Sequence, residues 1–398
     1  MSEWKEYKLG EIAEITSSKR IFYSEYVSKG IPFYRSKEII DKYNNREIQT
    51  ELYISELRYN EIKSKFGVPI KGDILLTSVG TLGIPYLLKD NEPFYFKDGN
   101  LTWIRNTVNN LIDVNFLYTW LKSNIGKQRL DEVVIGSTQP ALTINGLKTI
   151  DILLPPLSEQ RAIASVLSSL DDKIDLLHRQ NTTLEKMAET LFRQWFVEEA
   201  KEEWEETILD TVISIKGGTT PSTKESKFWD GDIYWTTPRD LSNQSTVFLF
   251  DTERKITQKG LEQIGSGLLP VGTVLLSSRA PIGYLVITEI PVAINQGYIA
   301  IICDKEVSNN FMYLWCKHNM EEIKNAGNGS VFQEISKSVF RKLCITLPPI
   351  EVLKRFDKTI EPSFNKIKAN QIQIHTLTTL RDTLLPKLMS GEVKIKEQ

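Results

Sequence analysis

Acidic and basic side chains at close spacing in the second half of the chain could form a metal-dependent nuclease site. Asp240 precedes Glu253-Arg254-Lys255, and an acid followed by E-x-K is the arrangement of some endonucleases that use a metal ion. The same spacing begins at Glu6, Glu225 and Glu392. Because E-x-K recurs this often, we interpret it as background and predict no nuclease.

Other reactive residue types also lack a catalytic spacing. The sequence contains neither G-x-x-x-x-G-K-[ST] nor G-x-G-x-x-G, so nucleotide binding has no visible motif. The histidines, His178, His318 and His375, lie far apart. The cysteines, Cys303, Cys316 and Cys344, have no C-x-x-C spacing, so we expect small buried apolar residues and no zinc site or disulfide framework. We therefore predict no catalytic and no metal-binding residues.

Length and composition indicate a globular protein of at least two domains. A chain of 398 residues exceeds the ~250 to 300 residues at which single cores stop growing. Its 41% hydrophobic and 25% charged residues include no apolar stretch long enough for a membrane span. Residues 1–9 lack the pattern of a secretory signal, so we expect a cytoplasmic protein without membrane contact.

The chain repeats itself. Residues 72–78 (GDILLTS) return as 272–278 (GTVLLSS), 31–38 as 233–240, and 116–122 (FLYTWLK) as 311–317 (FMYLWCK). Gly-Ser at 136–137 and Leu-Pro-Pro at 154–156 return at 329–330 and 347–349, both shifted by 193 positions. Five matches in one order indicate an internal duplication. Short apolar runs, such as residues 74–76 and 274–276, predict strand-rich modules, and the aromatic residues of 116–122 and 311–317 are interpreted as core.

A long amphipathic helix is predicted after each Pro-Pro. In the first, Ser158 can cap the helix, and apolar residues alternate spacings of four and three from Ile163 to Trp195, which is a heptad seam. The second shows the same rhythm from Phe356 to Leu388, and we expect Pro362 to kink it and Pro386 to end it.

The two seams match as an antiparallel pair. When facing residues have a constant index sum of 551, Ile163 meets Leu388 and Trp195 meets Phe356. Asn181 then meets Asn370, and a buried Asn pair is a known means of fixing helix register. Leu170 opposite Arg381 is the poorest match, unless the arginine stem lies along the seam with its head in solvent. Two unrelated helices, each packed on its own domain, are the alternative.

These features together resemble the specificity subunit of type I restriction-modification enzymes, over essentially the whole chain. The matching motifs are KLGEI at 8–12, GDILL at 72–76, LPPLSEQRAIA at 154–164 and LPKLMSG at 385–391. The resemblance implies an α+β fold of two similar strand-rich target-recognition domains, separated by two long antiparallel coiled-coil helices with pseudo-twofold symmetry. We place the first domain at 1–155, the first helix at 156–200, the second domain at 201–347, and the second helix with a C-terminal tail at 348–398.

The resemblance also implies a function without catalysis. Such a subunit reads an asymmetric bipartite site in double-stranded DNA and scaffolds two methyltransferase (modification) subunits and the restriction/translocase subunits. S-adenosylmethionine, ATP and Mg²⁺ are expected on those partners, and this chain is expected to bind no cofactor. Residues 1–155 carry a net charge of +1 and residues 201–347 a net charge of −3. Affinity for phosphates must therefore come from local clusters or from partners.

Polar side chains on loops beside the repeated motifs are the candidates for contacting bases, because Arg pairs with guanine and Asn or Gln with adenine. In the first domain they are Lys19, Arg20, Arg35, Lys37, Ser78, Thr81, Thr138 and Gln139. In the second they are Lys216, Thr219, Thr220, Arg239, Ser278, Arg279, Asn295, Gln296 and Gln333. Arg279 is the strongest single candidate.

Two alternatives remain open at this point. The recognition component of a type II system with a bipartite site shares this architecture, and a two-domain coiled-coil adaptor could bind proteins alone. The target sequence and its spacer length do not follow from the residues.

Overall fold

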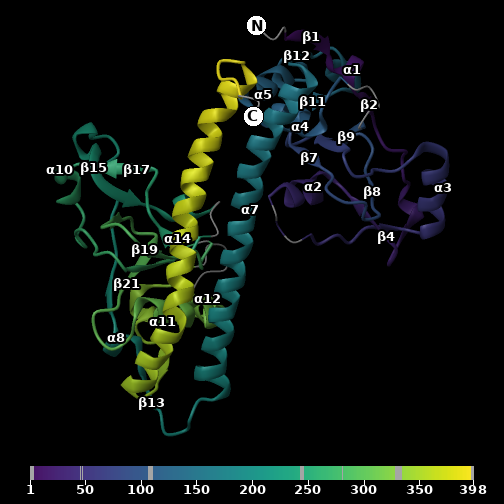
Figure 1. Cartoon of the computed structure of the whole chain (residues 1–398). Coiled ribbons are helices and arrows are strands. Elements are labelled where there is room, and N and C mark those ends of the chain that lie inside the picture. Colours follow the sequence, from purple (N-terminus) through teal and green to yellow (C-terminus); the bar gives the residue numbers. More distant parts are fainter. Residues whose placement is uncertain are drawn as a thin grey trace. The chain divides into compact units, whose positions relative to one another are not determined.

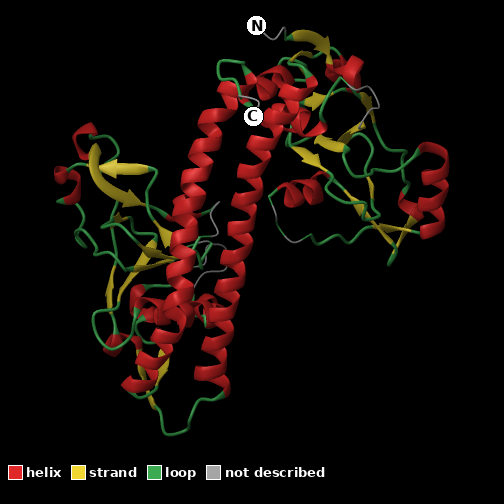
Figure 2. Cartoon of the chain, viewed as in Figure 1, coloured by secondary structure: helices red, strands yellow, loops and turns green. Residues whose placement is uncertain are grey.

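The chain divides into two compact units. In the computed structural model, which describes residues 4–44, 46, 48–105, 111–242, 246–279, 281–327 and 334–395, Met1–Asp175 and Thr376–Gln398 form unit 1. Leu176–His375 form unit 2. Figure 1 labels the elements along the chain, and Figure 2 distinguishes helices from strands. Among the described residues, no helix is long and apolar enough to cross a bilayer.

Unit 1 holds its strands in several small sheets. They are β1 (Lys5–Lys8), β2 (Glu14–Thr16), β3 (Tyr26–Val27), β4 (Ile31–Tyr34), β5 (Tyr53–Ile54), β6 (Ile74–Thr77), β7 (Pro85–Leu87), β8 (Tyr95–Phe96), β9 (Leu101–Arg105), β10 (Val134–Ile135), β11 (Ala141–Leu142) and β12 (Asp151–Leu154). The main sheet has the order β2-β9-β6-β7, a second has the order β3-β5-β4-β8, and β1 pairs with β12.

The helices of unit 1 flank these sheets. They are α1 (Leu9–Ile12), the 3-10 turn η1 (Tyr23–Glu25), α2 (Ser36–Tyr43), α3 (Glu56–Phe66), α4 (Val114–Lys122), α5 (Asn124–Asp131) and α6 (Ile144–Lys148). Asp113 begins α4 because its carboxylate accepts hydrogen bonds from the backbone N–H groups of Asn115 and Phe116. Phe116 and Trp120 of this helix are buried, which confirms the sequence interpretation of its aromatic residues as core.

Unit 2 repeats this plan. Its strands are β13 (Glu205–Ile208), β14 (Ser214–Lys216), β15 (Trp229–Thr236), β16 (Phe248–Leu249), β17 (Arg254–Ile256), β18 (Val274–Ser277), β19 (Leu285–Thr288), β20 (Ala293–Ile294), β21 (Tyr298–Ile302) and β22 (Cys344–Leu347). Its shorter helices are α8 (Leu209–Val212), the turn η3 (Ser226–Phe228), α9 (Pro238–Leu241), α10 (Gln258–Leu261), α11 (Asn309–His318), α12 (Met320–Asn325) and α13 (Lys337–Phe340).

The sheets of the two units correspond strand by strand. β14-β21-β18-β19 matches β2-β9-β6-β7, and unit 2 adds β16, parallel to β19, at the edge. The repeated Gly72 and Gly272 precede β6 and β18 with φ of 92° and 88°, a backbone region that favours glycine. The duplication predicted from sequence is therefore a duplication of fold.

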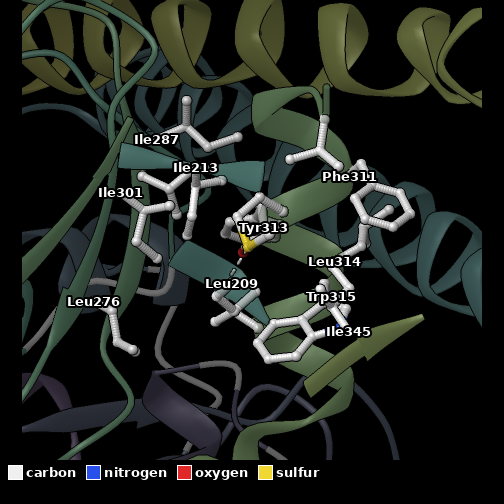
Figure 3. Packing of buried hydrophobic residues seen from close by; sticks show 14 of the residues in the cluster. Leu209, Ile213, Leu276, Ile287, Ile301, Phe311, Tyr313, Leu314, Trp315 and Ile345 are labelled. Carbon is white, nitrogen blue, oxygen red and sulfur yellow. Dashed lines mark hydrogen bonds between the residues drawn. The ribbon is translucent and has the colours of Figure 1, made fainter. Parts of the chain in front are cut away.

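Unit 2 has a core in which the sheet packs on α11. Figure 3 shows Leu276 and Ile301 from the sheet facing Phe311 and Leu314 from the helix. Ser308 caps α11 by accepting a hydrogen bond from the backbone N–H of Phe311. Trp315 is also buried, so this helix, like α4, uses its aromatic side chains for packing.

Two long helices each contribute to both units. They are α7 (Leu157–Arg193), extended by the π-helical η2 (Gln194–Glu198), and α14 (Ile350–Met389). In unit 1, Ile163 and Leu167 of α7 share a buried cluster with Leu388 of α14. The predicted α+β class, with two strand-rich domains and long helices packed together, is confirmed.

In unit 2 the same two helices meet as the constant index sum predicts. Leu184 and Ile367 share one buried cluster, and the rings of Trp195 and Phe356 lie 5.6 Å apart. The amide Nδ2 of Asn370 donates a hydrogen bond to Asn181 Oδ1 over 2.8 Å. Asn370 is fully buried. The helices therefore run antiparallel in the register read from the sequence, whereas a role for the Asn pair in fixing that register remains a prediction.

The ends of the long helices differ from the sequence expectation. α7 begins at Leu157, so Ser158 lies inside its first turn and is not the cap. α14 continues past Pro386 to Met389, and Pro362 lies within it. Pro386 does not end the helix, because Leu388 and Met389 beyond it are buried in the unit 1 core and hold the last turn in place.

Two further expectations need correction. Arg381 does not extend into solvent, because its Nη1 lies 2.9 Å from Asp171 Oδ1 and its side chain is 25% exposed. Of the three cysteines, Cys316 is buried and Cys303 is partly buried, but Cys344 is exposed. Its strand, β22, alternates exposed and buried residues, and Cys344 falls on the outer face.

Candidate nucleic-acid interface

In unit 1 a turn between β8 and β9, residues 97–100, gathers several of the predicted loop residues. Asp98 Oδ2 accepts a hydrogen bond from Arg20 Nε over 3.0 Å. The backbone carbonyl of Asn100 accepts hydrogen bonds from Ser78 N–H (2.8 Å) and from the Ser36 hydroxyl (3.3 Å). Segments that are far apart in sequence therefore meet at this turn.

A further loop of unit 1 joins the same region. Val79 and Ala141 form an isolated antiparallel bridge, and the N–H of Leu142 donates to Ser78 O over 2.9 Å. These bonds place the loop that carries Thr138 and Gln139 beside the end of β6, and both side chains are exposed.

Unit 2 repeats this arrangement around residues 295–297. The Thr220 hydroxyl donates to Gln296 Oε1 over 2.8 Å, and Ser278 N–H donates to Gly297 O over 2.8 Å. Arg279 and Glu334 form the isolated bridge that corresponds to Val79 and Ala141. The same backbone framework therefore presents the loops in both units.

The framework is shared, but its side chains differ. At the position where unit 1 has Arg20 with Asp98, unit 2 has Thr220 with Gln296. The turn itself has four residues in unit 1 and three in unit 2, counted between the same backbone hydrogen bonds to the neighbouring strands. Two surfaces of one design therefore offer different donors and acceptors.

The other candidates of unit 1 differ in exposure and in whether another side chain already binds them. Lys19 is exposed, and its Nζ lies 4.6 Å from the centre of the Phe66 ring. Lys37 and Thr81 are exposed. Arg35 instead pairs with the buried Glu38, with 2.7 Å between Arg35 Nη2 and Glu38 Oε1.

The Arg35–Glu38 pair keeps the buried Glu38 carboxyl group ionised. Burial alone raises the pKa of the Glu38 carboxyl, but hydrogen bonds from the Arg35 guanidinium and from backbone N–H groups hold this pKa below its ordinary value. Arg35 is therefore held by an internal partner, while its side chain remains 41% exposed.

In unit 2 the predicted residues are mostly exposed. Lys216, Thr219, Thr220, Arg239, Arg279 and Gln296 have exposed side chains, and Asn295 is partly buried. The Asn295 side chain accepts a hydrogen bond from Gly297 N–H over 2.9 Å, so it also shapes its own turn. Arg279 Nε lies 3.0 Å from Glu334 Oε1, and both side chains are about half exposed. Gln333 lies outside the described residues.

Two candidates do not meet the requirement on which they were chosen. Ser78 and Ser278 are only 2% and 4% exposed. The Ser78 hydroxyl hydrogen-bonds to Thr102 Oγ1 and to Leu76 O inside the sheet. The repeated serines therefore hold the turns through their backbones, and their side chains do not face a ligand.

Residues 97–100 were missed by sequence reasoning. Lys97 and Gly99 are exposed, and this turn occupies the place of Asn295–Gln296 in unit 2, which the sequence had indicated. The repeat itself was the available signal, but the extra residue in the first turn breaks the alignment there.

The nuclease-like residues serve the fold instead. Asp240 Oδ2 accepts hydrogen bonds from the Thr236 hydroxyl and from Thr237 N–H, which caps α9. The Arg254 guanidinium lies 3.6 Å from the centre of the Trp229 ring. Within the described ranges, no group of three or more His, Cys, Asp or Glu side chains could hold a metal ion.

Fold and loops together define a protein with two units of one architecture, whose loops carry different side chains. The family model described as "Type I restriction modification DNA specificity domain" matches residues 1–186 and 201–379. The chain belongs to this family.

Individual relatives agree with this family. The type I restriction enzyme HindI specificity subunit of Haemophilus influenzae is 25% identical over 470 residues, which cover 99% of this chain and all of that protein. The MjaIX specificity subunit of Methanocaldococcus jannaschii is 37% identical over 193 residues, 46% of this chain and only 44% of that protein. The S subunit of a type I system from M. genitalium has the same fold, with a TM-score of 0.64, 18% identity, and coverage of 100% and 97% of the two chains.

The chain is thus a specificity subunit that determines DNA target recognition within a type I restriction-modification complex. It is a recognition subunit and not the enzyme, and the cofactors of such a complex belong to the modification and restriction subunits. This membership decides against an adaptor that binds proteins alone, and it favours a type I over a type II system.

Proposed function

We propose that the chain reads an asymmetric, bipartite DNA site, with the loops of unit 1 on one half and those of unit 2 on the other. One observation carries this proposal: Arg20 with Asp98 and Thr220 with Gln296 occupy equivalent places on one backbone framework. Arginine favours guanine, and glutamine favours adenine. Surfaces with such different side chains suit different half-sites.

The proposed base-contacting residues are the candidates with exposed side chains, together with Lys97. They are Lys19, Arg20, Lys37, Thr81, Lys97, Thr138 and Gln139 in unit 1, and Lys216, Thr219, Thr220, Arg239, Arg279 and Gln296 in unit 2. Arg35, Asn295 and Gln333 complete the set, and the first two already have an internal hydrogen-bond partner. Lys37, Lys216 and Arg239 lie in α2, β14 and α9, and most of the other described residues lie on loops that backbone hydrogen bonds hold in place, which supports direct readout.

The long helices are proposed as the spacer between the half-sites. α7 has 37 residues and α14 has 40, so they span ~56 and ~60 Å at 1.5 Å per residue. Both lengths exceed one turn of DNA, ~34 to 36 Å. We retain the division into recognition domains at 1–155 and 201–347 and helical segments at 156–200 and 348–398, and Asn181 with Asn370 as the pair that fixes the register.

The proposed partners follow from the family. Two modification subunits and the restriction/translocase subunits would assemble on this chain, which places it in the cytoplasm with its double-stranded DNA. The sequence supports this dependence on partners, because a net charge of −2 supplies little general attraction for phosphates.

Long-read detection of methylated adenines tests the bipartite proposal. In a strain that expresses the chain with its modification subunits, we expect one asymmetric motif of two unlike halves with a fixed spacer. A strain lacking only this chain is the control and should show no such motif. A palindromic or continuous motif would contradict the proposal.

Arg279 offers a test at a single residue. In the assembled complex, Arg279→Ala should weaken binding to the target duplex by roughly 5- to 150-fold and relax the motif at one position of one half-site. Lys259→Ala, an exposed lysine of α10 outside these loops, is the matched control. Unchanged affinity and an unchanged motif would remove Arg279 from the proposed set.

A further inference from the structure

Two adjacent aromatic side chains of unit 1 stand in solvent. Phe22 is 61% exposed and Tyr23 is 93% exposed. Most tyrosines and phenylalanines of this chain are buried or partly buried, because an aromatic ring gains from leaving water. A pair of exposed rings on consecutive residues therefore indicates a contact surface.

The backbone holds these rings in their exposed positions. Phe22 N–H donates to Glu25 Oε2 over 2.7 Å, which closes the 3-10 turn η1. Glu25 is in turn paired with Arg58 of α3 over 2.7 Å. On one side of the pair Ile21 is buried, and on the other Tyr26 packs edge-on against Phe33 at 5.2 Å. Anchors on both sides present the two aromatic residues on a fixed turn.

The pair continues the proposed DNA-contacting loops. Lys19 and Arg20 precede the pair, separated from it only by the buried Ile21, and both are exposed. Arg20 is the residue that pairs with Asp98 of the 97–100 turn. Positive charge beside exposed aromatic rings is the combination with which proteins bind phosphates and stack on bases. A partner with an anionic backbone and flat apolar faces fits this surface.

Unit 2 lacks this feature at the equivalent place. Pro221 is buried as Ile21 is, and the next two residues are Ser222 and Thr223. The aromatic residues are therefore no requirement of the shared framework. They belong to what is particular to unit 1.

We propose that Phe22 and Tyr23 enter the DNA groove and stack against a base step that opens in the half-site read by unit 1. This inference rests on the proposed function and deepens it. Pyrimidine–purine steps open most easily, so such a step is the expected target. Unit 1 then selects its half-site partly by how easily the DNA deforms, and unit 2 does not use this mechanism.

Fluorescence of 2-aminopurine tests the inference, because the base brightens when it unstacks. The full chain, assembled with its modification subunits, is added to duplexes that carry the methylated motif with the probe at each position in turn. Methyltransferases flip their target adenine out of the stack, so probes at and next to the target adenines are excluded. At the other positions we expect a rise of several-fold at one step, confined to one half-site. The double variant Phe22→Ala with Tyr23→Ala should lose this rise, and its affinity for the duplex should fall by at least about tenfold.

Matched variants separate stacking from other effects. Tyr23→Phe should keep the fluorescence rise, because the ring and not the hydroxyl group stacks. Leu57→Ala, which replaces another exposed apolar residue of unit 1 (84% exposed), should behave as the unaltered chain does. Both aromatic positions lie in solvent, so the double variant should unfold at the same temperature as the unaltered chain.

Three other outcomes would contradict either the stacking inference or the proposed function. If the unaltered complex binds its motif without a 2-aminopurine rise away from the target adenines, or the double variant keeps that rise, the stacking inference is wrong while DNA recognition stands. If the double variant no longer assembles with the modification subunits, the rings form a protein contact instead. If the unaltered complex fails to bind the motif at all, the proposed function itself is wrong.

Discussion

The antiparallel helix seam is built differently in the two units, although equivalent positions line it in both. A shift of 193 residues relates α7 to α14, so Asp171 corresponds to Phe364 and Ala188 to Arg381. Unit 1 pairs Asp171 with Arg381 at 2.9 Å and with Lys122 at 2.7 Å. Unit 2 buries Phe364 and Ala188 in an aromatic cluster. The same helix seam thus accommodates either ion pairs or aromatic rings. Its stability should depend partly on charge pairing in unit 1 and on apolar burial in unit 2.

The largest effect should come from the aromatic seam. Phe356 is fully buried, and its ring lies 4.6 Å from Phe196 and 5.6 Å from Trp195. Phe356→Ala should lower the free energy of unfolding of unit 2 by about 3 to 5 kcal/mol through the cavity it leaves. Hydrogen exchange followed by mass spectrometry assigns the loss to a unit.

Ile163 is the matched position in unit 1, since it corresponds to Phe356 by the same shift. Ile163→Ala should cost about 2 to 5 kcal/mol and should act on unit 1. Equal loss of exchange protection in both units for either variant would show that the units do not unfold separately, which would contradict the comparison.

The Asn pair should produce the next largest effect. Asn181→Leu alone leaves the buried Asn370 amide without its partner and should cost about 1 to 3 kcal/mol. The double change to leucine should cost much less than the sum of the single changes, because it removes both polar groups. Denaturant titration of the two single variants and the double variant measures this coupling.

Leu177 and Ile374 supply the control for the Asn pair, because the shift of 193 maps Asn370 onto Leu177 and Asn181 onto Ile374. The amides can be moved there by Leu177→Asn with Ile374→Asn in the double leucine variant. The two introduced asparagines should then show the same energetic coupling at positions 177 and 374. Additive effects of Asn181→Leu and Asn370→Leu would exclude a specific pairing.

Acid should weaken unit 1 at Asp171. Burial alone raises the pKa of Asp171, but Lys122 and Arg381 outweigh it and hold this pKa below the ordinary value of 3.8. Since the folded pKa is the lower one, the stabilisation is complete above the unfolded value and is lost as pH falls through the folded value. Asp171→Asn should cost about 2 kcal/mol at neutral pH, less than a fully buried pair, and should flatten this acid dependence.

Thermal unfolding between pH 7 and pH 3 measures this effect. Asp172→Asn is the matched control, because the Asp172 side chain is 70% exposed and should contribute little. If Asp171→Asn and the unaltered chain lose stability in parallel below pH 4, the ion network does not distinguish unit 1.

The smallest effect concerns two equivalent ion pairs beside the helix seam. The long helix supplies the acidic residue in unit 1 and the basic residue in unit 2. In unit 1 Lys89 Nζ lies 3.8 Å from Asp175 Oδ2 of α7, and at the equivalent place in unit 2 Lys368 of α14 pairs with Glu289. Glu289 is 14% exposed and Lys89 is 65% exposed. Double-mutant cycles with alanine should give a coupling of about 1 kcal/mol for the unit 2 pair and under about 0.5 kcal/mol for the unit 1 pair. A stronger coupling in unit 1 would reverse the comparison.

Periodicity carried most of the fold. The spacing from Ile163 to Trp195 predicts a helical seam, and the index sum predicts the meeting of Asn181 with Asn370, because side-chain spacing along a helix is fixed by its geometry. Burial in the tertiary structure determines where a helix ends and which way a seam side chain points, and periodicity does not contain this information. The helix passes Pro386 because Leu388 is buried, and Arg381 turns inward because Asp171 faces it.

The loops were harder to predict than the helices. Ser78 is a polar residue beside a repeated motif, which makes it a candidate from sequence, but its hydroxyl group is buried and hydrogen-bonds to Leu76 O and Thr102 Oγ1. Lys97 was missed because its turn has one residue more than its counterpart. Loop contacts depend on which segments far apart in sequence meet, and spacing along one segment does not contain that information.

The turns at 97–100 and 295–297 are attached to the sheets by backbone atoms, through Tyr34 O, Thr236 O and the N–H groups of Ser78 and Ser278. Every amino acid supplies the carbonyl group, and every amino acid except proline supplies the N–H group. Mutation can therefore replace the side chains of a turn, or change its length by a residue, without loss of the bonds that hold it. Under the proposed function, such a lineage can acquire new DNA targets by small genetic steps while its fold is inherited unchanged, and each half-site can diverge independently of the other.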